Sequence, residues 1–236
     1  MKTLRTLVIG LVLLLLPTGA LDAQPAGAAP NKPAALVVSR SAYADKLHGF
    51  WLGQCIANWT GLRTEGHRKQ APFYTDADWG TTPENKRGRI EFVLVKKGEV
   101  GGADDDTDIE YIYQDLLHWH KRSVLTPEQI RDGWLKHIKT EEPNALWVSN
   151  ESALKLMAKG MAPPDTSLPE HNKNYSMIDA QLTTELFGLF APARPDVALE
   201  MAHLPIRVTA YRDAEWIAEF YVVMHALASR DRKSVV

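Results

Sequence analysis

The sequence predicts an all-α protein, a bundle of helices joined by long loops. Apolar residues recur every three or four positions in most of the chain after residue 40, which is the spacing of one helix face. Helix-starting and helix-ending residues stand at the boundaries of these segments, and only residues 90–95 show a strand-like apolar run. A helical bundle is the architecture that buries such faces.

The first predicted helix covers residues 41–62, with Ser41 as its N-cap. Its apolar positions trace one face, and we expect this helix to be buried, with Cys55 as a small residue of that face. Residues 63–104 are rich in Gly, Pro, Asp and Lys, which predicts loops and a small hairpin.

Later helices are predicted from their end signals as well as from their spacing. Thr126, Pro127 and Gln129 form an N-cap, a first-turn proline and a capping-box glutamine, which start a helix that runs to about residue 139. A helix over 149–159 ends at Gly160, and a long polar loop reaches residue 174. Three further helices are predicted over residues 177–190, 196–204 and 213–228.

The N-terminal residues have the layout of a secretory signal peptide. Lys2 and Arg5 precede an apolar run from Leu7 to Leu16, and small residues follow up to Ala23. The run is short for a membrane span, so we expect cleavage near Ala23 and an exported protein, periplasmic or secreted. On this basis residues 1–23 are a signal peptide, 24–40 a flexible leader and 41–236 the helical domain.

Charge and cysteine content exclude several classes. A net charge of −2 leaves no general nucleic-acid footprint, and the single cysteine cannot form an intramolecular disulfide. After signal cleavage we expect no membrane partner. The oligomeric state is not predicted.

Residues 104–108 contain four carboxylates in five positions at the predicted start of a helix that carries Ile109 to Leu117. Asp104, Asp105 and Asp106, here called the Asp triad, crowd negative charges that repel one another unless a cation neutralises them. A hard divalent ion with oxygen ligands fits such a cluster. Acidic residues also start helices without any ligand, so solvated capping is the alternative interpretation. Asp108 and Glu110 are expected to face solvent or the groups that contact the metal ligands.

Three blocks together resemble the ADP-ribosylglycohydrolase family, over about residues 43–228. Residues 47–57 resemble the family's opening helix, with Gln54 where an Asp is usual. Asp104-Asp105-Asp106-Thr107 resembles its Thr-Asp-Asp-Thr metal motif. The third block, which resembles the Asn-Gly-Ser-x-Met segment and the helix after it, consists of Asn174, Ser176, Met177, Asp179, Gln181, Gly188, Leu189, Pro195 and Ala198.

The resemblance implies an orthogonal multi-helix bundle and a magnesium-dependent hydrolase that cleaves a glycosidic bond to an ADP-ribosyl or related glycosyl group. It implies two Mg²⁺ ions in the intact protein, with the Asp triad among their ligands. It also implies Glu65 as a catalytic acid, and Asn174, Ser176 and Asp179 as residues facing a small-molecule substrate.

The chain departs from the family pattern near its C-terminus. Ala210 stands where many members have His, and a second Asp-x-Asp-Thr metal motif does not occur. Residues 231–236 resemble a translated sequencing adapter, so we expect a domain truncated at the C-terminus and a fragment inactive alone. The alternative function is a non-catalytic helical domain that binds a nucleotide-like or sugar-like ligand.

Overall fold

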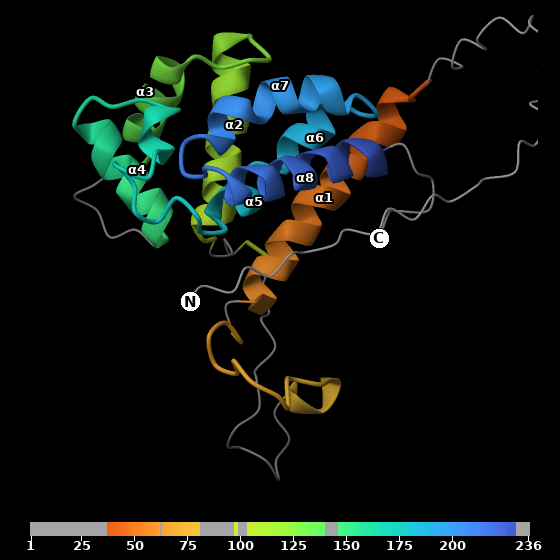
Figure 1. Cartoon of the computed structure of the whole chain (residues 1–236). Helices are drawn as coiled ribbons and strands as arrows, with labels where there is room; N and C mark the ends of the chain where they lie inside the picture. The colour runs from red at the N-terminus through yellow and green to blue at the C-terminus, as the bar shows by residue number, and fades with distance from the viewer. Residues whose placement is uncertain (1–36, 62, 81–96, 99–102, 140–145, 230–236) are drawn as a thin grey trace, which may run out of the picture. The chain divides into compact units, whose positions relative to one another are not determined.

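The computed structural model describes residues 37–61, 63–80, 97–98, 103–139 and 146–229. In these residues it contains eight α-helices, two short 3-10 helices and no strand (Figure 1). The predicted all-α class is therefore confirmed. The predicted signal peptide, most of the leader and the strand-like run at 90–95 lie outside the described residues.

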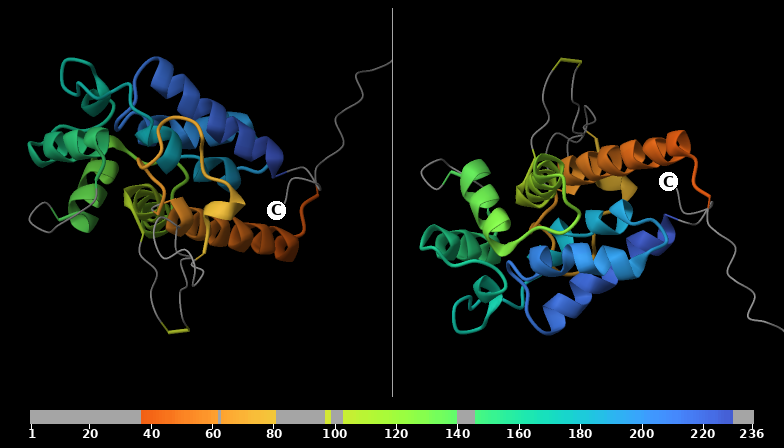
Figure 2. Two further views of the ribbon diagram at one scale, coloured as in Figure 1. Left: turned by 90° about the horizontal axis from the view of Figure 1, so that it is seen from below. Right: turned by 90° about the horizontal axis from the view of Figure 1, so that it is seen from above.

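Three helices form one side of the core: α2 (Asp105–His120), α3 (Pro127–His137) and α4 (Val148–Ala158). Thr126 caps α3 as predicted, because its hydroxyl accepts from the Gln129 amide and the Gln129 side chain accepts from the Thr126 amide. Tyr113 of α2 and Trp134 of α3 are fully buried, with ring centroids 6.3 Å apart. Figure 2 shows α2 almost end-on, crossing the other helices.

Four helices form the rest of the core: α5 (Asp179–Thr183), α6 (Leu186–Phe190), α7 (Pro195–Ile206) and α8 (Asp213–Ala228). The pair α7 and α8 packs most extensively. Gly188 of α6 allows a close approach to α8, since a Cβ there would lie 2.4 Å from the Val222 carbonyl oxygen and 2.8 Å from the Ala226 nitrogen. Any side chain at this position would force the two helices apart.

The prediction of one helix over residues 177–190 is wrong. The segment breaks into α5 and α6 at Thr184 and Glu185. The buried Thr184 hydroxyl donates to the Ala180 carbonyl over 2.6 Å, and Glu185 is turned toward the interior. A threonine hydroxyl bonded back to the preceding turn competes with regular helix continuation.

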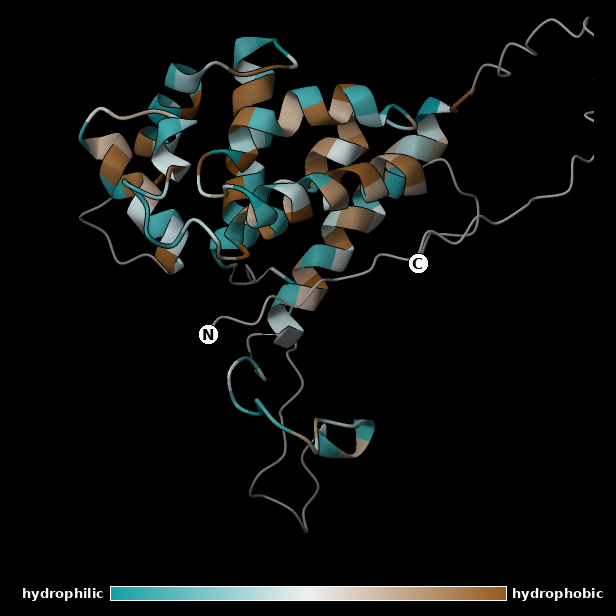
Figure 3. Ribbon diagram, viewed as in Figure 1, coloured by the Kyte–Doolittle hydropathy of each residue, from teal (hydrophilic) through white to brown (hydrophobic). Residues whose placement is uncertain are grey.

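Helix α8 turns small residues inward and large apolar residues outward. Its buried residues are Ala214, Ala218, Val222 and Ala226, whereas Trp216 and Phe220 are 64% and 62% exposed. In Figure 3, the ribbon of α8 includes hydrophobic segments. Among the described residues, none of the helices combines the length and the apolar content needed to cross a membrane.

Helix α1 (Arg40–Gly61) forms as predicted, but the expectation that it is buried is wrong, since none of its 22 residues is buried. Cys55 is only partly covered. The helix touches the core through a few contacts, such as the Tyr43 hydroxyl donating to the Leu189 carbonyl and Lys46 Nζ donating to the Ser229 carbonyl over 3.2 Å. A cavity of about 680 Å³ separates much of α1 from α6 and α8, which explains the lack of burial.

Candidate metal centre

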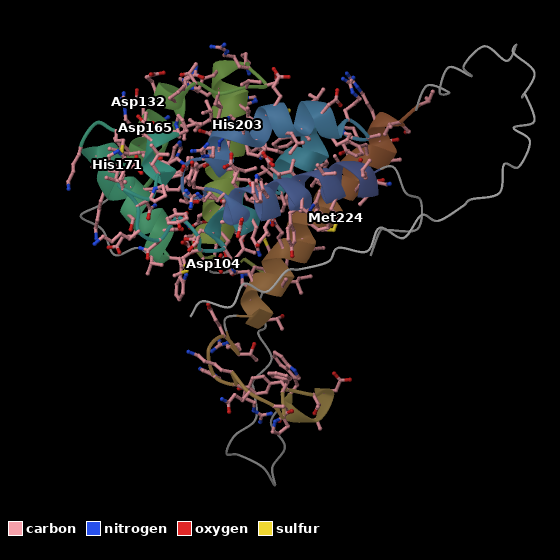
Figure 4. All side chains as sticks on the ribbon, viewed as in Figure 1. Asp104, Asp132, Asp165, His171, His203 and Met224 are labelled. Atoms are coloured by element: carbon pink, nitrogen blue, oxygen red, sulfur yellow. The ribbon has the colours of Figure 1, made fainter. Side chains whose placement is uncertain are left out.

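The Asp triad lies at the N-terminus of α2, where Figure 4 labels Asp104. One carboxylate oxygen from each of the three residues lies within 4.8 Å of the others. Asp104 is the N-cap, and its Oδ1 accepts from the Thr107 amide over 3.4 Å. Capping therefore accounts for one carboxylate of the triad and leaves the roles of the other two to be explained.

Neighbouring helices hold two of these carboxylates in place. The side-chain amide of Asn58, on α1, donates to Asp104 Oδ2. Asp105 Oδ2 accepts from the Trp147 backbone amide over 2.5 Å and from Asn150 Nδ2 over 2.9 Å. The triad is thus oriented by α1 and by the start of α4, and it is not a freely rotating surface cluster.

Asp106 is the carboxyl of the triad with the largest change in acidity. Burial, with the negative charges of Asp105, Asp104, Asp179 and Glu185 as further contributions, raises its pKa to about 8. Burial, together with Asp104 and Asp105, also raises the pKa of Asp108. Without a cation, Asp106 therefore holds a proton at neutral pH, and a bound cation would replace that proton.

The triad lines a cavity of about 270 Å³. The other lining residues are Glu65, Trp147, Ile178, Asp179 and Leu182. Asp179 is buried and accepts from the Asn150 amide over 3.2 Å, and burial raises its pKa. The structure thus brings together Asp104, Asp105, Asp106, Glu65 and Asp179, five of the seven site residues predicted from sequence.

The other two predicted site residues lie elsewhere. Ser176 lines a neighbouring cavity of about 340 Å³ with Tyr175 and Arg212, and the two cavities share Ile178. Asn174 donates to the Val148 carbonyl over 3.3 Å and to the Ser152 hydroxyl over 3.2 Å. It therefore ties the loop to α4.

Three residues that contact the triad, Asn58, Trp147 and Asn150, were not predicted from the sequence. Asn58 interrupts the apolar face of the first helix, which was a signal that this face meets polar groups. The position of Asn150 did not indicate a role at the site, because asparagine is common near the start of a helix. Glu110 was expected to face solvent or the ligands' surroundings, and it is instead fully buried in the interior.

The donor and acceptor balance fits a hard cation. Asp179 Oδ2, Asn58 Oδ1 and Asn150 Oδ1 are buried acceptors without a hydrogen-bond donor in the part of the chain that the structure describes. Asp179 lines the cavity with the triad, and the two Asn side chains donate to Asp104 and Asp105, so the polar side chains at the cavity offer oxygen ligands. Mg²⁺ prefers such ligands, and among the described residues no His or Cys, which softer metals favour, lines this cavity.

Comparison with known proteins agrees with this geometry. A family model described as ADP-ribosylglycohydrolase matches residues 39–236. The curated proteins and the solved structures that were compared gave no match. The family match covers most of the chain and includes the whole cavity. The chain therefore belongs to the ADP-ribosylglycohydrolase family, and its function is in general of the glycohydrolase type, directed at a small-molecule glycosyl substrate.

Proposed function

We propose that this protein is a magnesium-dependent hydrolase that cleaves a glycosidic bond to an ADP-ribosyl or related glycosyl group. The observation that carries the proposal is the Asp triad, with ligand atoms within 4.8 Å of one another, in a cavity that also holds Glu65 and Asp179. Carboxylates that converge on one cavity are candidates for a metal or a catalytic role at a small-ligand site.

Asp104, Asp105 and Asp106 would hold the metal. When bound there, Mg²⁺ would orient and polarise ribosyl hydroxyl groups beside the scissile bond. The protein itself contributes to metal binding by holding the carboxylates of the triad in a fixed orientation. Asn58 and Asn150 hold Asp104 and Asp105 by their side-chain amides, so the cluster needs little reorganisation when a ligand enters.

Glu65 is the proposed acid and base. It lines the cavity from the loop that follows α1 and is exposed at its edge. A carboxyl in this position can give a proton to the leaving group and take one from the attacking water, which is the division of labour that glycosidic hydrolysis requires. Asp179, at the start of α5, also lines the cavity and would face the sugar hydroxyls.

The rest of the substrate would extend along the lining. The Trp147 side chain is 53% exposed and borders the cavity, so it offers a face for a base or a sugar ring. Ser176 and Arg212 border the adjoining cavity beyond Ile178, where a cationic side chain suits a phosphate group. Asn174 acts in this proposal by fixing the loop against α4.

Export is part of the proposal, because the charged, apolar and small-residue regions of residues 1–23 have the order of a signal peptide. Expression in a bacterial host with a functional export pathway, followed by N-terminal sequencing of the exported chain, tests it. A mature N-terminus near residue 24 is expected. Retention of Met1 in the cytoplasmic fraction would contradict export.

Because this sequence lacks the family's second metal motif, the activity is tested on a version of the protein that carries that motif, as release of free ADP-ribose from N-linked and O-linked ADP-ribosyl substrates. We expect release in Mg²⁺, loss in a chelator, and at least a 100-fold decrease in the rate for D105N/D106N. D108N is the matched control, because Asp108 is adjacent in sequence but does not line the cavity. Metal-independent release would refute the mechanism, and binding of ADP-ribose without turnover of any glycosyl substrate would favour the non-catalytic alternative.

A further inference from the structure

Glu110 is the most unusual buried group in the described residues. Its side chain is fully buried on α2, one turn beyond the Asp triad. Gln54 and the Leu186 amide lie near its carboxyl, yet neither Oε1 nor Oε2 has a hydrogen bond of ordinary geometry among the described residues. A buried carboxylate with such poor hydrogen bonding is strongly disfavoured as an anion, so a proton or a cation must neutralise it.

Glu185 places a second carboxyl beside the first. It stands at the break between α5 and α6, directly before Leu186, and its Oε2 is also buried without a partner in the described part of the chain. The charge of Glu185 acts on Glu110, and burial raises the pKa of both groups. Gln54 of α1 adds a third buried acceptor, since its Oε1 has no donor in the described residues.

Two of these three side chains line a cavity that differs from that of the Asp triad. Glu185 and Gln54 line the cavity of about 680 Å³ between α1 and helices α6 and α8. None of the triad residues lines it. A ligand can therefore reach Glu185, one member of the buried acid pair (Glu110 and Glu185), without passing through the cavity of the proposed hydrolytic site.

We propose that Glu110, Glu185 and the Gln54 side-chain oxygen form a second cation site, for a divalent ion with oxygen ligands, separate from the Asp triad. Two carboxylates match the charge of such an ion, and the amide oxygen adds a neutral ligand of the same hard type. The ion would link α1, α2 and α6, which otherwise share few contacts. The site does not depend on the proposed hydrolytic reaction.

A shared proton is the competing explanation, because two carboxyls close together in a dry interior can be neutralised by protons alone. The two explanations differ in what the chain binds. A cation site takes up one ion per chain and loses it when the carboxyls become amides. A protonated pair takes up none.

The experiment is a titration with Mn²⁺ alone, with free Mn²⁺ followed by electron paramagnetic resonance. The background is D104N/D105N, which disables the triad but keeps Asp106, whose charge acts on both acidic regions. We expect this background to bind one Mn²⁺ per chain and to bind none after the further change E110Q/E185Q. The exposed pair E170Q/E200Q is the matched control and should retain the ion.

Stability gives a second readout. Without metal, E110Q/E185Q should unfold at a higher temperature than the background, because two buried carboxyls become neutral amides. Mn²⁺ should raise the melting temperature of the background but not that of E110Q/E185Q. The single variant E185Q serves if the double variant does not fold. The proposal is overturned if the background binds no Mn²⁺, or if the amide substitutions leave binding unchanged.

Discussion

Helix α1 and the helices that follow it meet the core in opposite ways. The 22 residues of α1 include none that is buried, whereas α2, with 16 residues, buries Ile109, Glu110, Ile112, Tyr113 and Leu116. Yet α1 supplies Asn58 to the Asp triad and Gln54 to the buried acid pair. The buried core that stabilises the fold therefore lies in α2 to α8, while α1 mainly brings polar groups to the two acidic regions.

The largest effect expected from this contrast is on core aromatic residues. Phe187 is fully buried and its ring lies 5.5 Å from that of Tyr113, so Phe187→Ala should destabilise the fold by about 3–5 kcal/mol. Leu52 of α1 is 60% exposed, and Leu52→Ala should cost no more than about 0.5 kcal/mol. Urea denaturation followed by circular dichroism measures both. Equal losses would show that α1 belongs to the core after all.

Glycines in the two regions should respond with opposite signs. A Cβ at Gly188 meets the α8 backbone at 2.4 Å, so Gly188→Ala should destabilise by about 1–3 kcal/mol or more. A Cβ at Gly53 in α1 meets nothing within 4 Å, and Gly53→Ala should stabilise by about 0.5–1 kcal/mol through helix propensity. The same denaturation experiment measures them. A stabilised Gly188→Ala would mean that α6 and α8 are not closely packed.

Asn58 tests whether α1 matters for the site more than for the fold. Asn58→Ala removes the donor to Asp104 and should weaken Mg²⁺ binding at the triad about 10-fold, with a small change in stability. Calorimetric titration measures the affinity. Thr60→Ala is the control, because in the described part of the chain its hydroxyl bonds to the Ile56 carbonyl, within α1 itself. Equal affinities of the two variants would remove α1 from the metal site.

The pH dependence of the stability of the metal-free chain should also distinguish α1 from the Asp triad. The pKa of Asp106 is raised from 3.8 to about 8, so between these values the folded chain binds more protons than the unfolded chain. The free energy of unfolding should therefore be highest at the acidic end of this window and decrease as pH rises toward 8. Asp106→Asn should flatten this slope, whereas Asp45→Asn on α1, which is exposed, should not. Melting temperatures measured from pH 5 to 8 provide the test.

Much of the fold could be read from local signals. The boundaries predicted for 213–228 match α8, and the Thr126 cap starts α3 where expected, because these ends depend on residues next to each other in the chain. The crowding of Asp104, Asp105 and Asp106 was likewise visible, since adjacent carboxylates stay adjacent in any fold. Glu65 and Asp179 were proposed through resemblance, and the structure places both beside the triad.

The sequence by itself determined the helical class, most helix ends and the acidic start of α2, since each follows from residues within a few positions of one another. Only the tertiary structure decided that α1 lies outside the core, that residues 177–190 break into two helices at Thr184 and Glu185, and that Ser176 lines a different cavity from Asp179. It also placed Glu110 beside Glu185, 75 positions away. Such burial depends on which distant surfaces cover a side chain, and helical periodicity cannot specify that partner.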